Sequence, residues 1–164
     1  MSLYHLNVTI HLLAAFLWLG GMFFLALVGA PVLRGVEPPA LRAELFQRLG
    51  RRYRTAGWLA IAALLLTGVA NLQFRGVLHG PTLRDPRFWE TPFGEALAWK
   101  LAAVLVMLVV QAVHDFLVGP AASAATPGSR EADRLRRWSA WLGRLNALVG
   151  IGLVIAALRL ARGG

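Results

Sequence analysis

Long stretches without a charged side chain constrain this sequence more than any other feature. Residues 1–33, 55–74, 101–114 and 145–158 contain no Asp, Glu, Lys or Arg. A helix that crosses the hydrocarbon core of a bilayer needs about 20 consecutive, mostly apolar residues. Each stretch meets or approaches that length. The sequence therefore predicts an all-α protein, a four-helix transmembrane bundle with spans at about residues 5–30, 55–74, 98–119 and 139–159.

The composition agrees with an integral membrane protein. Of the 164 residues, 57% are hydrophobic and only 15% are charged, and the mean hydropathy is +0.59. This length predicts a single membrane domain over residues 1–164. No basic residue precedes the first span, and Pro31 follows its only small-residue cleavage candidate, so we expect that span to be a mature helix rather than a signal peptide.

The net charge of +9 indicates contact with membrane lipid rather than binding of nucleic acid. Most of the 17 basic residues flank the predicted spans, where they would meet anionic lipid. The first and third connections carry ten Lys or Arg residues, against six in the second connection and the C-terminal tail. The positive-inside rule then predicts a bacterial inner-membrane protein with both termini outside.

The connections themselves differ in character. Residues 38–54 place apolar residues at helical spacing among arginines, which predicts a short amphipathic helix on the cytoplasmic surface. Residues 80–94 contain three prolines and predict an ordered loop rather than a helix. Residues 119–129 are rich in small residues and predict a flexible linker.

Polar residues close to the spans are the functional candidates, because ionisable side chains are costly in hydrocarbon. The chain has four histidines, His5, His11, His79 and His114, and Asp115 is the acid nearest a span core. A plainer alternative stays open for each histidine, namely an interfacial or helix-to-helix hydrogen bond. There is no cysteine, which excludes disulfides, thiolate metal sites and cysteine catalysis.

His11 shares a helical face with Trp18, and Gly21 falls beside that stripe. Small residues there would let a second backbone or a flat cofactor approach closely. In the third span, Lys100 and Met107 share a face with His114 at intervals of seven residues. His114 is followed at once by Asp115, which could pair with a basic residue or orient a ligand.

Without a large offset between the helices, the two intramembrane histidines cannot both ligate one iron. His11 lies near the outer end of the first span, and His114 lies near the inner end of the third. At ~1.5 Å per residue their depths differ by roughly 15 Å. His79, just past the second span, is therefore the expected partner of His11, with His5 behind it. His114 would serve a second site or none.

The type and number of these side chains favour haem b over other metal groups. Zinc or copper sites want three or four clustered ligands, whereas haem needs one or two axial histidines, an apolar cleft and basic groups for its propionates. Trp18 and Gly21 would shape that cleft, and Arg75 and Lys100 would pair with the propionates. His5, His11, His79 and His114 are the candidate metal ligands, with one or two haems expected and copper as the alternative.

Several segments resemble a known family. They are "WLGGMFFLALVGAPVLR" (18–34), "RRYRTAGWLAIAALLLTGVANL" (51–72) and "TPFGEALAWKLAAVLVMLVVQAVHDF" (91–116). The chain resembles the copper-resistance D (CopD) domain from about residue 5 to 120. "HLLAAFLWLGG" (11–21) also looks like the first span of the HemJ-type protoporphyrinogen oxidases. There a histidine seven residues before a tryptophan is implicated in haem b binding, and that match falls on His11 and Trp18.

These observations predict a small membrane b-type cytochrome that transfers electrons, with quinol or a redox protein as partner. Such a protein would be a haem-dependent oxidoreductase of the membrane. The alternatives are a copper permease or copper-handling membrane protein of the CopD type, a HemJ-like oxidase, and a structural subunit with interfacial histidines. The lipid bilayer is the expected environment. Gly150 and Gly152 would permit a homodimer, although small residues also pack within a monomer.

Overall fold

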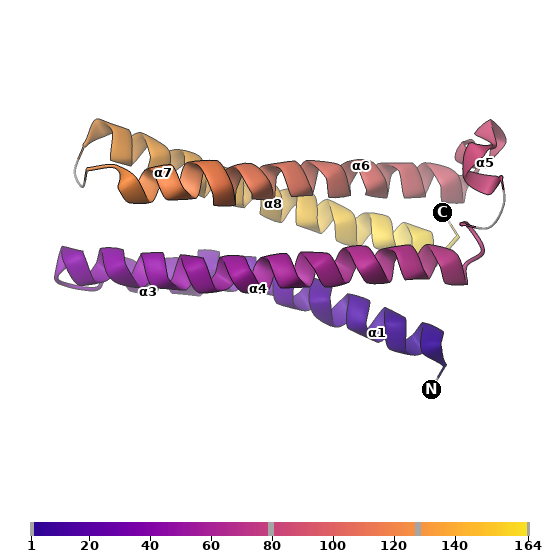
Figure 1. Cartoon of the computed structure of the whole chain (residues 1–164), viewed down its shortest axis with the longest axis horizontal. Coiled ribbons are helices and arrows are strands. Elements are labelled where there is room, and N and C mark those ends of the chain that lie inside the picture. The colour runs from indigo at the N-terminus through magenta and orange to yellow at the C-terminus, as the bar shows by residue number, and fades with distance from the viewer. Residues whose placement is uncertain (1, 79–80, 127–128, 164) are drawn as a thin grey trace. The chain divides into compact units, whose positions relative to one another are not determined.

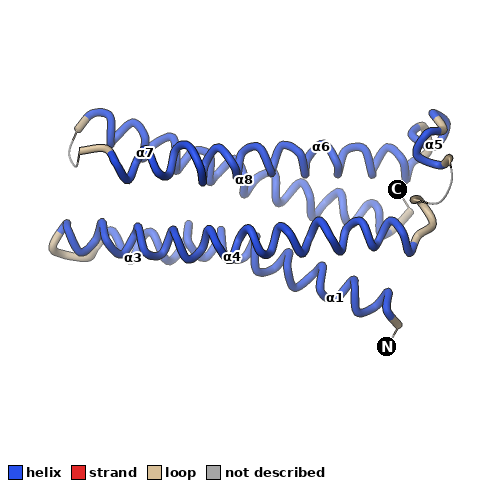
Figure 2. The backbone as a smooth tube through the Cα atoms, in the orientation of Figure 1, coloured by secondary structure: helices blue, strands red, loops and turns tan. Residues whose placement is uncertain are grey.

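Over the residues that the structure describes, the chain is all-α and contains four helices long and apolar enough to cross a membrane. The computed structural model describes residues 2–78, 81–126 and 129–163, and no strand occurs among them (Figure 2). The long helices run over Leu3–Arg34, Pro39–Phe74, Pro92–Ala124 and Arg130–Ala161. Each predicted span lies within one of them, which confirms the fold class.

The helices form two compact units, Met1–Thr82 and Leu83–Gly164, each an antiparallel hairpin of two long helices (Figure 1). We call them the N-terminal and C-terminal hairpins and describe each by itself. The predicted His79 lies outside the described residues.

The N-terminal hairpin pairs a composite helix with α4, Pro39–Phe74. The composite helix runs without interruption through α1 (Leu3–Ala15), η1 (Phe16–Gly20), α2 (Gly21–Phe24), η2 (Leu25–Gly29) and α3 (Ala30–Arg34), of which η1 and η2 are π-helical. Between the two helices, Trp18 is 3% exposed and Ile61 is 1% exposed.

The C-terminal hairpin pairs a second composite helix with α8, Arg130–Ala161. That helix comprises α6 (Pro92–Ala112), the π-helical η4 (Val113–Val118) and α7 (Gly119–Ala124). The chain reaches it through η3 (Thr82–Arg84) and α5 (Pro86–Trp89). Thr91 and Ser129 cap the two long helices, because their side-chain oxygens accept from the N–H groups of Gly94 and Ala132.

A nearby proline explains two of the π-helical segments, η2 and η4. Pro31 lies two residues after η2, and Pro120 lies two residues after η4. A proline in a helix removes one N–H donor, and its ring collides with the carbonyl four residues earlier. Those carbonyls belong to Leu27 in η2 and Phe116 in η4. The wider π turn gives the carbonyl room, so the helix continues through the proline.

This continuity corrects three predictions about the connections. Residues 39–54 are not a separate surface helix but the first part of α4. The predicted linker at 119–129 is helical to Ala124, because η4 accommodates Pro120. The segment 80–94 is not helix-free: η3, α5 and the start of α6 lie within it, since proline is well tolerated in the first turn of a helix.

Candidate functional site

In the N-terminal hairpin, a polar cluster joins α1 to α4. The Nδ2 group of Asn7 donates to the Thr67 carbonyl oxygen at 3.0 Å and to Asn71 Oδ1 at 2.9 Å. His11 Nδ1 lies 2.7 Å from Thr67 Oγ1, and that hydroxyl donates its proton to the Ala63 carbonyl oxygen. Thr67 Oγ1 therefore accepts from His11, which places a proton on His11 Nδ1.

About two turns further along the helix, the Tyr53 side chain covers the face that carries Trp18 and Gly21. The Tyr53 hydroxyl donates to the Trp18 carbonyl oxygen at 2.5 Å. A Cβ atom added to Gly21 would lie 2.4 Å from Tyr53 Cε2. The space over Gly21 is thus occupied by the Tyr53 ring, so within this hairpin the glycine allows an aromatic side chain of α4 to pack.

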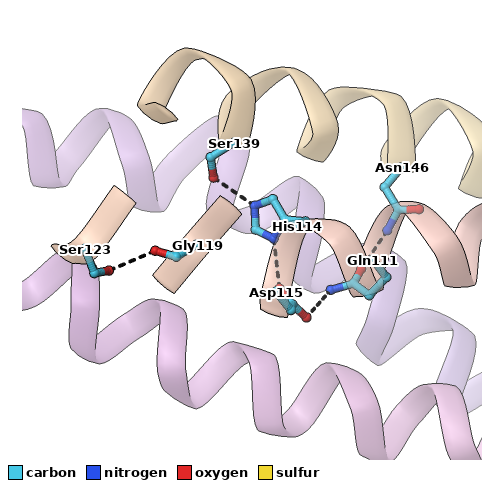
Figure 3. Close-up of polar contacts among 7 residues, drawn as sticks. All are labelled: Gln111, His114, Asp115, Gly119, Ser123, Ser139 and Asn146. Atoms are coloured by element: carbon cyan, nitrogen blue, oxygen red, sulfur yellow. Dashed lines mark hydrogen bonds and ion pairs between the residues drawn. The ribbon is translucent and has the colours of Figure 1, made fainter. Parts of the chain in front are cut away.

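The C-terminal hairpin holds a hydrogen-bonded chain that links the α6–η4 helix to α8 (Figure 3). Asn146 Nδ2 donates to Gln111 Oε1, and Gln111 Nε2 donates to Asp115 Oδ2, both at 2.6 Å. His114 Nδ1 lies 2.8 Å from Asp115 Oδ1, and Ser139 Oγ lies 3.0 Å from His114 Nε2. We call these five residues the polar network.

Burial makes the polar network expensive unless its bonds are satisfied. Gln111 and Asp115 are each 7% exposed, and Asn146 is 2% exposed. A buried amide or carboxylate without partners costs several kcal/mol in an apolar medium, so such groups persist only when they are bonded. In the polar network both Asp115 oxygens and both His114 nitrogens lie within hydrogen-bond distance of a partner.

The structure brings together only some of the predicted site residues. His5 lies in the exposed first turn of α1, where its Nδ1 is 2.5 Å from Ser2 Oγ. Arg75 follows the last turn of α4 and is exposed, and Lys100 lies two turns into α6. Met107 is 3% exposed on the face of α6 that carries Gln111.

Metal-ligating groups do not cluster within the described ranges. Over residues 2–78, 81–126 and 129–163, no three His, Asp or Glu side chains come close enough to hold one ion. Sequence reasoning missed Thr67, Asn71 and Tyr53 as partners in the N-terminal hairpin. In the C-terminal hairpin it missed Gln111 as the partner of Asp115 and Ser139 as the partner of His114. A usable signal existed for Gln111, which stands four residues before Asp115 and so shares its helix face.

Comparison with known proteins adds the family. Residues 47–160 match the family described as copper resistance protein D. The chain belongs to the CopD family. An uncharacterised protein of Aquifex aeolicus (strain VF5) is 30% identical over 155 residues, which cover 94% of this chain and 92% of the relative. No solved structure matches.

The CopD match covers the polar network completely but only part of the polar cluster between α1 and α4. The matched residues 47–160 include all five members of the polar network, together with Thr67 and Asn71, whereas His11 lies before them. The match confirms the predicted CopD resemblance, and the HemJ resemblance stays a prediction. As a CopD-family protein with four apolar helices, the chain is a multi-pass membrane protein.

Proposed function

We propose that this protein handles copper within the membrane, as a permease or a hand-off protein. The match of residues 47–160 to the copper-resistance family carries the proposal. The residues alone favour a haem protein with copper handling as the alternative, and the family match favours copper handling.

The metal-binding side chains of this protein suit transient copper binding better than stable copper storage. Cysteine is absent from the sequence, and the described residues hold no cage of three His, Asp or Glu side chains. Imidazole nitrogen is a suitable ligand for copper. Sites with few ligands bind weakly enough to release an ion, and conduction requires that property.

The haem prediction has less support from the N-terminal hairpin. Haem there would require an open cleft beside His11, yet Trp18 is 3% exposed and the Tyr53 ring covers Gly21. Haem b, electron transfer and a quinol partner therefore stand as the rival outcome of the experiment.

The experiment measures metal and haem in one sample. The full chain, purified in detergent, is equilibrated with copper(I) buffered by bicinchoninate and analysed for bound copper. The absorption spectrum of the same sample is recorded before and after dithionite. We expect about one copper per chain and no Soret band. A b-type spectrum with no bound copper would overturn the proposal in favour of the cytochrome.

A functional test accompanies the metal analysis. Cells that lack the protein should change their copper tolerance, and restoration of the gene should reverse the change. We expect Thr67→Val to weaken this complementation if His11 contributes to copper transfer, because the variant removes the acceptor of His11 Nδ1. Thr9→Val is the matched control, since the Thr9 hydroxyl bonds to the His5 carbonyl oxygen on the exposed side of α1.

A further inference from the structure

We propose that the first half of α8 (Figure 1) carries a binding site for the headgroup of an anionic phospholipid. Three arginines and two tryptophans on one exposed face of the helix form it, and we call them the headgroup site: Arg134, Arg137, Trp138, Trp141 and Arg144. The inference does not depend on the proposed copper handling, because the headgroup site shares no residue with the polar network or with the polar cluster between α1 and α4.

Helical spacing brings these five side chains to one face. Because α8 is α-helical throughout, residues three, four and seven positions apart lie on the same side of it. Trp138 follows Arg134 by four positions, and Trp141 follows Arg137 by four. Arg144 comes three positions after Trp141, and all five residues are exposed. The face is therefore continuous and accessible to a ligand.

The two tryptophans mark the level of the membrane interface on this face. Their rings meet edge to face, with 6.1 Å between the centroids, and Trp138 is 50% and Trp141 53% exposed. Tryptophan is enriched where headgroups meet hydrocarbon. Beyond the pair the same face is aliphatic, with Leu148 65% and Ile155 55% exposed. This change of polarity matches a phospholipid, with its headgroup at the arginines and an acyl chain along the aliphatic residues.

The arginines of the headgroup site are not balanced by neighbouring acids. Residues 130–144 contain five arginines against Glu131 and Asp133, a net charge of +3. Asp133 forms its ion pair with Arg136 at 2.6 Å, and Arg137 acts on that carboxylate through its charge alone. Over the described part of the chain, no ion pair involves an arginine of the headgroup site. This excess of positive charge at the interface attracts an anion.

Arg144 indicates that this anion belongs to a lipid rather than to a free ion. It lies within the predicted span at 139–159, where an unpaired guanidinium is costly. Helical side chains lean toward the N-terminus, so its long side chain leads back toward Trp141 and the arginine-rich start of α8. A phosphodiester anchored by acyl chains stays at this level of the bilayer, whereas inorganic phosphate stays in water.

The arginines also select for the net charge of the headgroup. Exposed tryptophan rings alone would suit the quaternary ammonium of phosphatidylcholine through cation–π contacts. Three guanidinium groups around the rings repel choline, and each can bind phosphate oxygens through two parallel hydrogen bonds. A headgroup with a phosphate and no cation therefore fits the headgroup site better than a zwitterionic one.

The test titrates the full chain in detergent with phosphatidylglycerol or phosphatidylcholine and counts bound lipid by native mass spectrometry. We expect the wild type to bind one phosphatidylglycerol about 10-fold more tightly than phosphatidylcholine. Arg144→Gln and Arg137→Gln should each weaken that binding about fivefold, which corresponds to about 1 kcal/mol for an arginine near a membrane surface. Trp141→Leu, which leaves the charge unchanged, should weaken it several-fold. Inorganic phosphate should not displace the lipid.

Two matched controls separate a discrete site from diffuse attraction. Arg52→Gln removes the same charge from an exposed position of α4, and Trp99→Leu removes a tryptophan of α6 that is 66% exposed. Both should leave the affinity unchanged. The inference is overturned if Arg52→Gln weakens binding as much as Arg144→Gln, if Trp141→Leu has no effect, or if phosphatidylcholine binds as tightly. Displacement of the lipid by inorganic phosphate also overturns it. If Arg144→Gln fails to fold, Arg137→Gln and Trp141→Leu decide, and copper binding is unaffected by each of these outcomes.

Discussion

At the scale of single residues, Gly21 shows how one missing atom fixes a contact between helices. Its bare Cα admits the Tyr53 ring, and the ring in turn delivers a hydroxyl to the Trp18 carbonyl oxygen. Gly20, next to it, faces open space. Two adjacent glycines of the same helix therefore have opposite roles.

We expect Gly21→Ala to destabilise the protein by about 1–3 kcal/mol, because a Cβ atom would force the Tyr53 ring to move in a packed interface. Gly20→Ala should be neutral or stabilising by up to about 1 kcal/mol, since alanine favours helix and meets no neighbour. Reversible unfolding in mixed micelles measures both variants. Equal effects of the two substitutions would contradict the assigned role of Gly21.

The sequence singled out His11, Trp18, Gly21, His114 and Asp115, but it could not supply their partners. Thr67 is 56 residues from His11, and a helical periodicity identifies a face without saying which residue of another helix opposes it. Gly21 illustrates the difficulty, because the same small residue would suit a cofactor or a tyrosine. Only the register of α1 against α4 decides between them.

At the scale of elements, the amide bond between Gln111 and Asn146 ties α6 to α8 across 35 residues of sequence. Both side chains are buried in the hairpin. Loss of one partner leaves the other buried and unsatisfied, which costs more than the bond itself contributes. The double substitution should therefore destabilise the protein by less than the sum of the two single substitutions.

A double-mutant cycle with Gln111→Leu and Asn146→Leu should give a coupling free energy of about 0.5–1.5 kcal/mol, as found for hydrogen bonds between transmembrane helices. The exposed pair Arg136–Asp133, within one helix, serves as control and should give no more than about 0.5 kcal/mol. Additive effects of the two leucine substitutions, as measured by unfolding, would show that the bond does not join the helices.

Helix number and type were predictable at this scale, but helix ends were not. A run of apolar residues indicates a span because backbone groups in hydrocarbon must bond within the helix. Proline and glycine at 119–120 predicted a break, and η4 removed it by widening the turn ahead of the proline. The rule that glycine and proline end a helix fails here because the π turn before Pro120 makes room for its ring.

At the scale of the whole molecule, the distribution of arginine predicts orientation. The arginines of Pro39–Arg54 and those at the start of α8 lie in the first and third connections of the predicted topology. The positive-inside rule predicts that both lie in the cytoplasm. We therefore expect the two termini and the segment around α5 to lie outside.

Because the chain has no cysteine, single cysteines at exposed positions test this orientation directly. In intact cells, a membrane-impermeant maleimide should label Glu90→Cys and Arg162→Cys. Gly35→Cys and Thr126→Cys should react only after the membrane is permeabilised. The opposite pattern would invert the topology.

The uninterrupted course of α4 has a mechanical consequence. At ~1.5 Å per residue, its 36 residues extend about 54 Å, while the hydrocarbon core is about 30 Å thick. The arginine-bearing part therefore extends beyond the span that carries Thr67 and Asn71, and α3 packs against it. Because both parts belong to one continuous helix, a tilt of that span within the bilayer would displace the arginine-bearing end among the lipid headgroups.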